Sequence, residues 1–99
     1  MVKLVTAEEL KKESGNYIVD FYANWCGPCR MLAPILEKLS EEIDTVKFFK
    51  IDVETDREFA IKNNISSIPA IILYQNGVEK KRRVGFASKA DFKKWLEEN

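Results

Sequence analysis

The feature that most limits the fold of this chain is a run of β-branched and aromatic residues from Tyr17 to Ala23, Y-I-V-D-F-Y-A. Apolar residues do not alternate with polar ones here, so the run predicts a strand that is buried on both faces. A strand of this kind belongs in a sheet covered by helices, which is the α/β class. Because 99 residues can bury one core but not two, we expect a single domain over residues 1–99.

Helical and strand patterns alternate along the rest of the chain. The expected helices are Thr6–Glu13, Cys26–Ile43, Thr55–Asn63 and a last helix that begins at Ser88. The expected strands are a short Lys3–Val5, then Tyr17–Ala23, Val46–Val53, Ala70–Gln75 and Val78–Val84. Strands separated by helices pair in parallel, whereas Asn76-Gly77 is a strong signal for an antiparallel hairpin. The prediction is a mixed central sheet, with parallel strands and a C-terminal antiparallel hairpin, flanked by four helices.

Local signals set the expected ends of the helices. Thr6-Ala7-Glu8-Glu9 and Thr55-Asp56-Arg57-Glu58 have the form of capping boxes, Ser88 caps the last helix, and Gly15 ends the first. Pro34 should bend the long helix because it removes a backbone hydrogen bond. The apolar stripes are core packing: Leu32, Ile35, Leu36, Leu39 and Ile43 in the long helix, and Phe92, Trp95 and Leu96 in the last.

Composition excludes several classes of function. The formal net charge is zero, from 16 basic and 16 acidic residues, so no net field attracts nucleic acid or an acidic membrane. The basic run Lys80–Arg83 is better explained as charge protection on an edge strand. The N-terminus has no apolar signal segment, no run is long enough to span a bilayer, and the expected compartment is the cytoplasm. No histidine is present, which removes imidazole bases and Cys/His zinc sites, and no metal is expected.

The two cysteines, Cys26 and Cys29, lie between the buried strand and the long helix. Residues three apart in a helical turn have Cβ atoms roughly 5–6 Å apart, so a disulfide can close with little backbone movement. The helix N-terminus favours a thiolate at Cys26, and Cys29, one turn further in, should be more buried. These positions suit Cys26 to attack a disulfide in another protein and Cys29 to resolve the mixed disulfide. Pro28 stiffens the ring between the sulfurs.

The run V-D-F-Y-A-N-W-C-G-P-C-R resembles the active-site segment of the thioredoxin family, and the order of helices and strands matches over essentially the whole chain. The resemblance implies a thioredoxin fold and a dithiol protein-disulfide reductase that carries electrons. Its partners would be protein substrates with disulfides and a thioredoxin reductase. It would act as a monomer, with no cofactor other than the Cys26–Cys29 disulfide itself.

Two charged residues have candidate roles beside the sulfurs. From the pattern alone, Asp20 is either a buried carboxyl with a pKa raised toward neutrality, suited to exchange protons with Cys29, or an acid on a solvated face or bulge. The resemblance to the family's buried aspartate favours the first. Lys50 resembles the lysine that approaches that aspartate, and the alternative is an ordinary surface lysine.

The resemblance also implies a substrate surface around Trp25, Gly27 and Pro28. An X–Pro bond is trans by default, but the family's proline at the position of Pro69 is cis and faces the disulfide. There the backbone of Ile68 would pair with an extended substrate segment, and Gly85 would leave room for it. Trp25 would be a partly exposed ring against the target.

The sequence departs from the family pattern near this proline and beside the active-site run. Ala70 stands where threonine is common, Asn64 and Ser67 stand where glycines are frequent, and Tyr22 replaces a frequent tryptophan. Because Asn tolerates left-handed backbone, the fold should survive, and substrate preference is what these changes bear on.

Three rival functions remain at this point. An oxidising or isomerising thiol protein is disfavoured by Gly-Pro between the cysteines and by the missing export signal. A non-catalytic binding module is disfavoured because both cysteines are present. A metal cluster shared between two chains would give coloured, iron-containing dimers.

Overall fold

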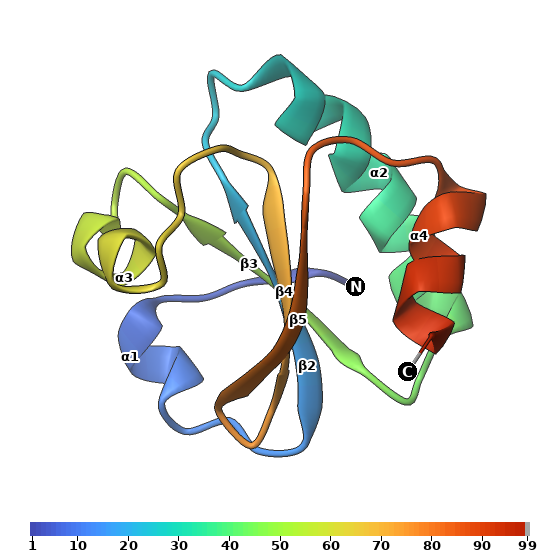
Figure 1. Cartoon of the computed structure of the whole chain (residues 1–99), viewed down its shortest axis with the longest axis horizontal. Helices are drawn as coiled ribbons and strands as arrows, with labels where there is room; N and C mark the ends of the chain where they lie inside the picture. Colours follow the sequence, from blue (N-terminus) through green and yellow to red (C-terminus); the bar gives the residue numbers. More distant parts are fainter. Residues whose placement is uncertain (99) are drawn as a thin grey trace.

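The computed structural model describes residues 1–98, and residue 99 of the expected domain lies outside the described part. Its elements are β1 (Lys3–Leu4), α1 (Ala7–Leu10), β2 (Asn16–Tyr22), α2 (Gly27–Glu42), β3 (Lys47–Asp52), α3 (Arg57–Lys62), β4 (Ala70–Gln75), β5 (Val78–Val84) and α4 (Lys89–Glu97). Figure 1 shows the sheet in the middle, with α1 and α3 on one side and α2 and α4 on the other. The predicted α/β architecture is confirmed.

Within residues 1–98 the strands form one mixed sheet in the order β1-β3-β2-β4-β5. β3 pairs in parallel with β1 and β2, whereas β4 pairs antiparallel with β2 and β5. β2 is therefore the central strand, which explains why its sequence is apolar on both faces. The basic run Lys80–Arg83 lies on β5, at an edge of the sheet, as predicted.

Each face of the sheet has its own core. Toward α2 and α4, the buried cluster includes Ile18 and Ile71 from the sheet and Leu32, Leu36, Leu39 and Phe92 from the helices. Toward α1 and α3, the cluster is built mainly by the sheet, with Tyr17, Val19, Phe21, Phe49, Ile72 and Tyr74. The apolar stripes of α2 and α4 are thus core packing, as the periodicity indicates.

The first and third helices are shorter than expected: α1 ends at Leu10 instead of Glu13, and α3 spans Arg57–Lys62 instead of Thr55–Asn63. After Leu10, the N–H groups of Lys12 and Glu13 donate to carbonyls three residues back, so α1 loosens into tighter turns instead of continuing to Glu13. The capping box at Thr6 is present, and Ser88 accepts from the Asp91 N–H.

The capping box predicted at Thr55 is wrong. The N-cap of α3 is Asp56, and it makes no side-chain capping bond. Its carboxylate instead accepts from the N–H of Ala7, and the Thr55 hydroxyl donates to the carbonyl of Asp52. The side chains that the pattern assigned to capping therefore make other contacts: Asp56 makes a tertiary contact, and Thr55 makes one within a local turn. None of the helices in the described part of the chain is long and apolar enough to cross a membrane.

Candidate active site: a disulfide at the start of α2

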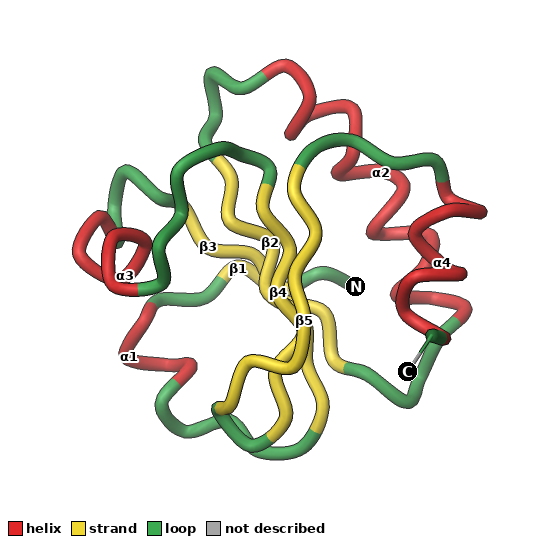
Figure 2. Tube along the Cα trace, viewed as in Figure 1, coloured by secondary structure: helices red, strands yellow, loops and turns green. Residues whose placement is uncertain are grey.

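Three connecting segments meet at one end of the sheet. They join β2 to α2, α3 to β4 and β5 to α4, and Figure 2 shows all three in green at the top of the view. The first contains Cys26 and leads into Cys29 in the first turn of α2, the second contains Ile68 and Pro69, and the third contains Gly85. Residues far apart in the sequence therefore form one site.

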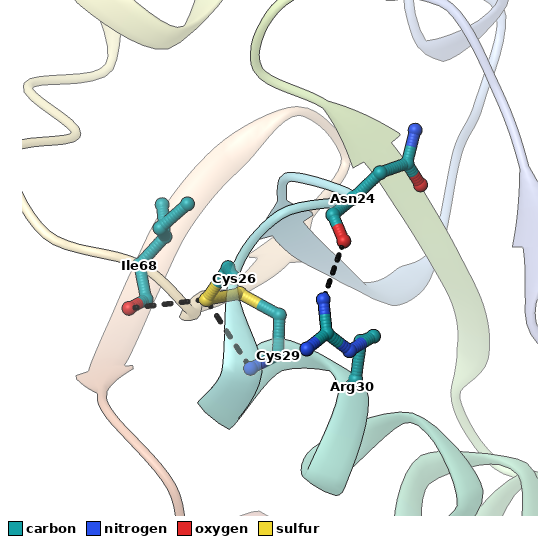
Figure 3. Close-up of a disulfide and its surroundings, with 5 residues drawn as sticks. All are labelled: Asn24, Cys26, Cys29, Arg30 and Ile68. Atoms are coloured by element: carbon teal, nitrogen blue, oxygen red, sulfur yellow. Dashed lines mark hydrogen bonds between the residues drawn. A yellow bond between two sulfur atoms is a disulfide. The ribbon is translucent and has the colours of Figure 1, made fainter.

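Cys26 and Cys29 form a disulfide across the first turn of α2, with their Cα atoms 5.2 Å apart (Figure 3). Cys26 is the N-cap residue in extended backbone, and Pro28 lies in the first helical turn, as predicted. The N–H of Cys29 donates to the Sγ of Cys26 at 3.2 Å. This donor and the positive end of the helix dipole both stabilise negative charge on that sulfur.

The two cysteines are buried almost equally, at 4% exposure for Cys26 and 3% for Cys29. Cys29 is therefore more buried than Cys26, as expected, but only by a small margin. The reason is tertiary: both side chains join a small apolar cluster with Ala23, and Tyr22, Val53 and Ile68 pack against it. In this oxidised form, these neighbours shield Cys26 from solvent although it lies at the exposed end of the helix.

The segment with Ile68 and Pro69 lies directly against the disulfide. The Ile68–Pro69 peptide bond is cis, as the resemblance implied. The carbonyl oxygen of Ile68 lies 3.9 Å from the Sγ of Cys26 (Figure 3). The N–H of Gly85 donates to the Pro69 carbonyl at 2.8 Å, which ties the third segment to the second. Gly85 has a φ of +94°, and a Cβ there would meet open space.

Apolar side chains are exposed on the segments that contain Cys26 and Gly85. Trp25 is 66% exposed, more open than the partly exposed ring that was expected. Val84 and Phe86, on either side of Gly85, are also exposed. Gly27 is half-buried and Pro28 is exposed. Phe86 was missed in the sequence, although an aromatic residue directly after the Val84-Gly85 step was a usable signal.

Asp20 is buried in the middle of β2, at 3% exposure, on the face that meets α2. Burial raises its pKa to about 7, and the nearby Lys50 acts in the opposite direction. One carboxylate oxygen, Oδ1, has no hydrogen-bond partner among the described residues. The buried alternative for Asp20 is therefore confirmed, and the solvated-face alternative is wrong.

A cavity of about 180 Å³ connects Asp20 with Cys29, because both residues line it. Lys50 also lines this cavity, and it lies opposite Asp20 in the β2–β3 pairing. The ammonium of Lys50 stands 5.6 Å from the centre of the Tyr22 ring. Lys50 thus faces the site from the neighbouring strand rather than being an ordinary surface lysine.

Arg30, directly after Cys29, lines the same cavity and was missed in the sequence analysis. Its guanidinium donates to the carbonyl of Asn24 at 2.9 Å, which ties α2 back to the segment before the disulfide (Figure 3). The sequence showed a basic residue after the second cysteine, but no local pattern indicated that it would hydrogen-bond to the carbonyl of Asn24.

Within residues 1–98, no group of three cysteine or acidic side chains lies close enough together to hold a metal ion. The reactive group of the site is the Cys26–Cys29 pair, whose disulfide can form and break with little backbone movement. A mixed sheet with such a pair at the start of a helix defines the class of dithiol oxidoreductases.

Comparison with known proteins gives the family. The thioredoxin family model matches residues 3–98. The chain is 43% identical to a thioredoxin of Mycoplasma genitalium over 82 residues, covering 83% of this chain and 80% of that protein. It is 47% identical to thioredoxin-1 of Saccharomyces cerevisiae over 68 residues, covering 69% and 66%.

A solved structure agrees with the sequence comparison. The thioredoxin of Malassezia sympodialis superposes with a TM-score of 0.87 at 29% identity, covering 97% of this chain and 88% of that one. The chain belongs to the thioredoxin family. It is a thiol–disulfide oxidoreductase that carries electrons as a dithiol.

Proposed function

We propose that this chain reduces disulfides in other proteins, with Cys26 as the attacking sulfur. The Cys26 thiolate attacks one sulfur of the target disulfide, whose other sulfur leaves as a thiolate. Cys29 then loses its proton and attacks the Sγ of Cys26, which releases the second target thiolate. Two electrons pass to the target, and the Cys26–Cys29 disulfide remains. The observation that carries this assignment is the N-cap position of Cys26 with the Cys29 N–H on its sulfur.

Asp20 is the proposed acceptor of the proton that Cys29 releases. It shares the 180 Å³ cavity with Cys29, and a carboxyl with a pKa of about 7 can accept and return a proton near neutral pH. A water in the cavity would bridge the two groups. Lys50, beside the carboxyl, would limit how far burial raises its pKa.

The target is proposed to bind as an extended segment beside Ile68, whose backbone would pair with it as an added strand. The position of the Ile68 carbonyl beside Cys26 supports this arrangement. Trp25, Gly27 and Pro28 would contact the segment on one side, and Pro69 and Gly85 on the other. Their apolar or side-chain-free surface is suited to a chain that varies in sequence.

Electrons are proposed to come from a thioredoxin reductase, and the chain is proposed to work as a monomer in the cytoplasm without a resident cofactor. Its two cysteines are both in the redox pair, so no further disulfide stabilises the fold. This usage suits a compartment where thiols are kept reduced.

The Cys29→Ser variant tests the assignment of the sulfurs. Mixed with disulfide-bonded insulin, it should accumulate a covalent adduct through Cys26, because the resolving sulfur is missing. The Cys26→Ser variant is the control and should form no such adduct. Mass spectrometry of the mixtures distinguishes the two. If the adduct forms with Cys26→Ser instead, the two roles are reversed, and if neither variant forms one, the chain is a binding module.

A second measurement separates a reductant from an oxidant. The Cys26–Cys29 pair is equilibrated with mixtures of reduced and oxidised glutathione, and alkylation reports the reduced fraction. A reductant remains oxidised until the glutathione mixture is strongly reducing. A pair that is mostly reduced in a mildly oxidising mixture would assign the chain to the oxidants.

A further inference from the structure

Strand β5 contains an irregularity next to the hairpin. Leu73 of β4 lies opposite Lys81, but the next residue, Tyr74, lies opposite Glu79. Lys80 is therefore an extra residue without its own partner in β4, which is a β-bulge.

The bulge changes which side chains share a face. In a regular strand, residues three apart point to opposite faces of the sheet. With one residue extra, Glu79 and Arg82 lie on the same face. The two side chains make a paired contact, with Nε and Nη2 of Arg82 donating to the two Glu79 carboxylate oxygens at 2.7 Å each. This pairing lowers the pKa of Glu79 and raises that of Arg82.

The guanidinium of Arg82 also reaches the C-terminal end of α3. Nη2 donates to the carbonyl of Asn63 at 2.9 Å, and Nη1 donates to the carbonyl of Asn64 at 3.4 Å. Carbonyls at the end of a helix have no partner within the helix, and a cation there also complements the helix dipole. Arg82 thus connects the edge strand to the point where α3 ends.

The backbone at this point is unusual. Asn64 has a φ of +57°, in the left-handed region that most residues avoid. The side chain of Asn63 is held as well, because its amide donates to the Phe59 carbonyl and its oxygen accepts from the Tyr74 hydroxyl. The chain therefore leaves α3 in one defined direction.

That direction leads to the substrate side of the site. Only four residues, 65–68, separate Asn64 from Pro69. Ser66 and Ser67 are exposed, whereas Ile65 and Ile68 pack partly against the core, so the hydrogen bonds at the ends of the segment add to this packing in placing Ile68. Gly85 holds the far end through the Pro69 carbonyl, and Arg82 holds the near end.

We propose that Arg82, oriented by Glu79 across the bulge, is a positioning residue that holds the segment 65–68 so that the Ile68 backbone is aligned for pairing with a polypeptide substrate. The inference rests on the proposed function, because it assumes that substrates pair with Ile68.

The test compares two disulfides that differ in whether they have a backbone to pair. One is insulin, which the protein reduces while dithiothreitol re-reduces the protein. The other is the small disulfide 5,5′-dithiobis(2-nitrobenzoate). In Arg82→Gln, the insulin rate should fall about fivefold because the acceptor segment is misaligned, whereas the rate with the small disulfide stays within twofold. Arg82→Lys should restore part of the insulin rate, since one ammonium cannot replace a planar fork.

The matched control is Lys80→Gln, which removes a positive charge from the bulge itself without touching the segment. It should behave as the parent with both disulfides. Equal rates for Arg82→Gln and the parent, or an equal fall with both disulfides, would overturn the proposal, because the second result marks a purely structural role. If Arg82→Gln does not fold, Glu79→Gln and Arg82→Lys give the same comparison. A parent protein that reacts with the small disulfide but not with insulin would overturn the proposed function itself.

Discussion

On one side of the sheet, α2 and α4 bury long apolar stripes, with Leu32, Leu39 and Phe92 fully buried. On the other side, α1 and α3 have four and six residues, and the sheet's own aromatic side chains supply much of the core. Rings stack there within the sheet and between β2 and α3, as in the pairs Tyr17–Tyr74 and Phe21–Phe59. Polar contacts made by Asp56, Asn63 and Arg82 complete this side.

The active site lies where these two layers meet. The sulfurs are on α2, whose long apolar face fixes it against the sheet. Ile68 lies on the segment after the short α3, whose end is held by hydrogen bonds. The sulfurs of the disulfide are thus placed by apolar burial of α2. The Ile68 backbone, which is proposed to pair with the substrate, is placed largely by a few hydrogen bonds.

The largest expected effect comes from Asp20, which among the described residues is the buried acid on the apolar α2/α4 side. In the unfolded chain an aspartate loses its proton near pH 4, whereas in the folded protein the pKa of Asp20 is about 7. As the pH rises from 4 to 7, the unfolded state gives up this proton first, so the free energy of unfolding falls by about 4 kcal/mol and then levels off. Asp20→Asn should remove this fall in the free energy of unfolding between pH 4 and pH 7, because the amide does not titrate.

Urea unfolding of the oxidised forms measures this, because the sulfurs then do not titrate. The variant and the parent should have similar free energies of unfolding at pH 4, and the variant should be more stable by about 4 kcal/mol at pH 8. The exposed Glu41→Gln is the control and should not change the pH profile. A difference that is the same at pH 4 and pH 8 would show that Asp20 is not the group responsible.

The next effect compares equal truncations on the two sides. Leu36→Ala, in the enclosed α2/α4 core, should lower the free energy of unfolding by about 3 kcal/mol, since it leaves a closed cavity. Leu10→Ala, on α1, should cost about 2 kcal/mol because Leu10 borders a surface groove that can relax or admit water. Denaturant unfolding at one pH gives both values, and a larger loss at Leu10 would contradict the comparison.

The smallest effect tests the polar contacts of the α1/α3 side. Tyr74→Phe removes the hydroxyl that donates to Asn63 at 3.0 Å but keeps the ring stacked on Tyr17, so the expected loss is about 1 kcal/mol. Tyr17→Phe is the matched control, because the Tyr17 hydroxyl makes no hydrogen bond with any described residue. Thermal unfolding of both variants measures the difference. Equal losses would show that the hydroxyl of Tyr74 contributes nothing to this side.

Local patterns predicted the elements well where their signals act over a few residues. Asn76 and Gly77 both have positive φ, and the strands around them have the predicted bounds, Ala70–Gln75 and Val78–Val84. The capping interactions of Thr6 and Ser88 were predicted correctly for the same reason. The pattern at Thr55 failed because a contact from Ala7, 49 residues away, uses the carboxylate of Asp56.

The candidate site was predictable in its chemistry and less so in its contacts. The spacing of Cys26 and Cys29 and the apolar run around Asp20 pointed to a redox pair and a buried acid. The nearly equal burial of the two sulfurs and the hydrogen bond from Arg30 to Asn24 were not visible in any local pattern. The bulge at Lys80 was also hidden, because only the pairing with β4 reveals an extra residue.

By itself, the sequence determined the α/β class, the ends of most elements and the close pair of sulfurs at a helix start, because turns, caps and helical spacing depend on neighbours along the chain. No local pattern determined that Cys26 lies against Ile68, 42 residues away, or that Lys50 faces Asp20; the family resemblance implied these contacts, and the tertiary structure shows them. These contacts depend on strand order and register, which follow from how whole faces pack together rather than from any short stretch of residues.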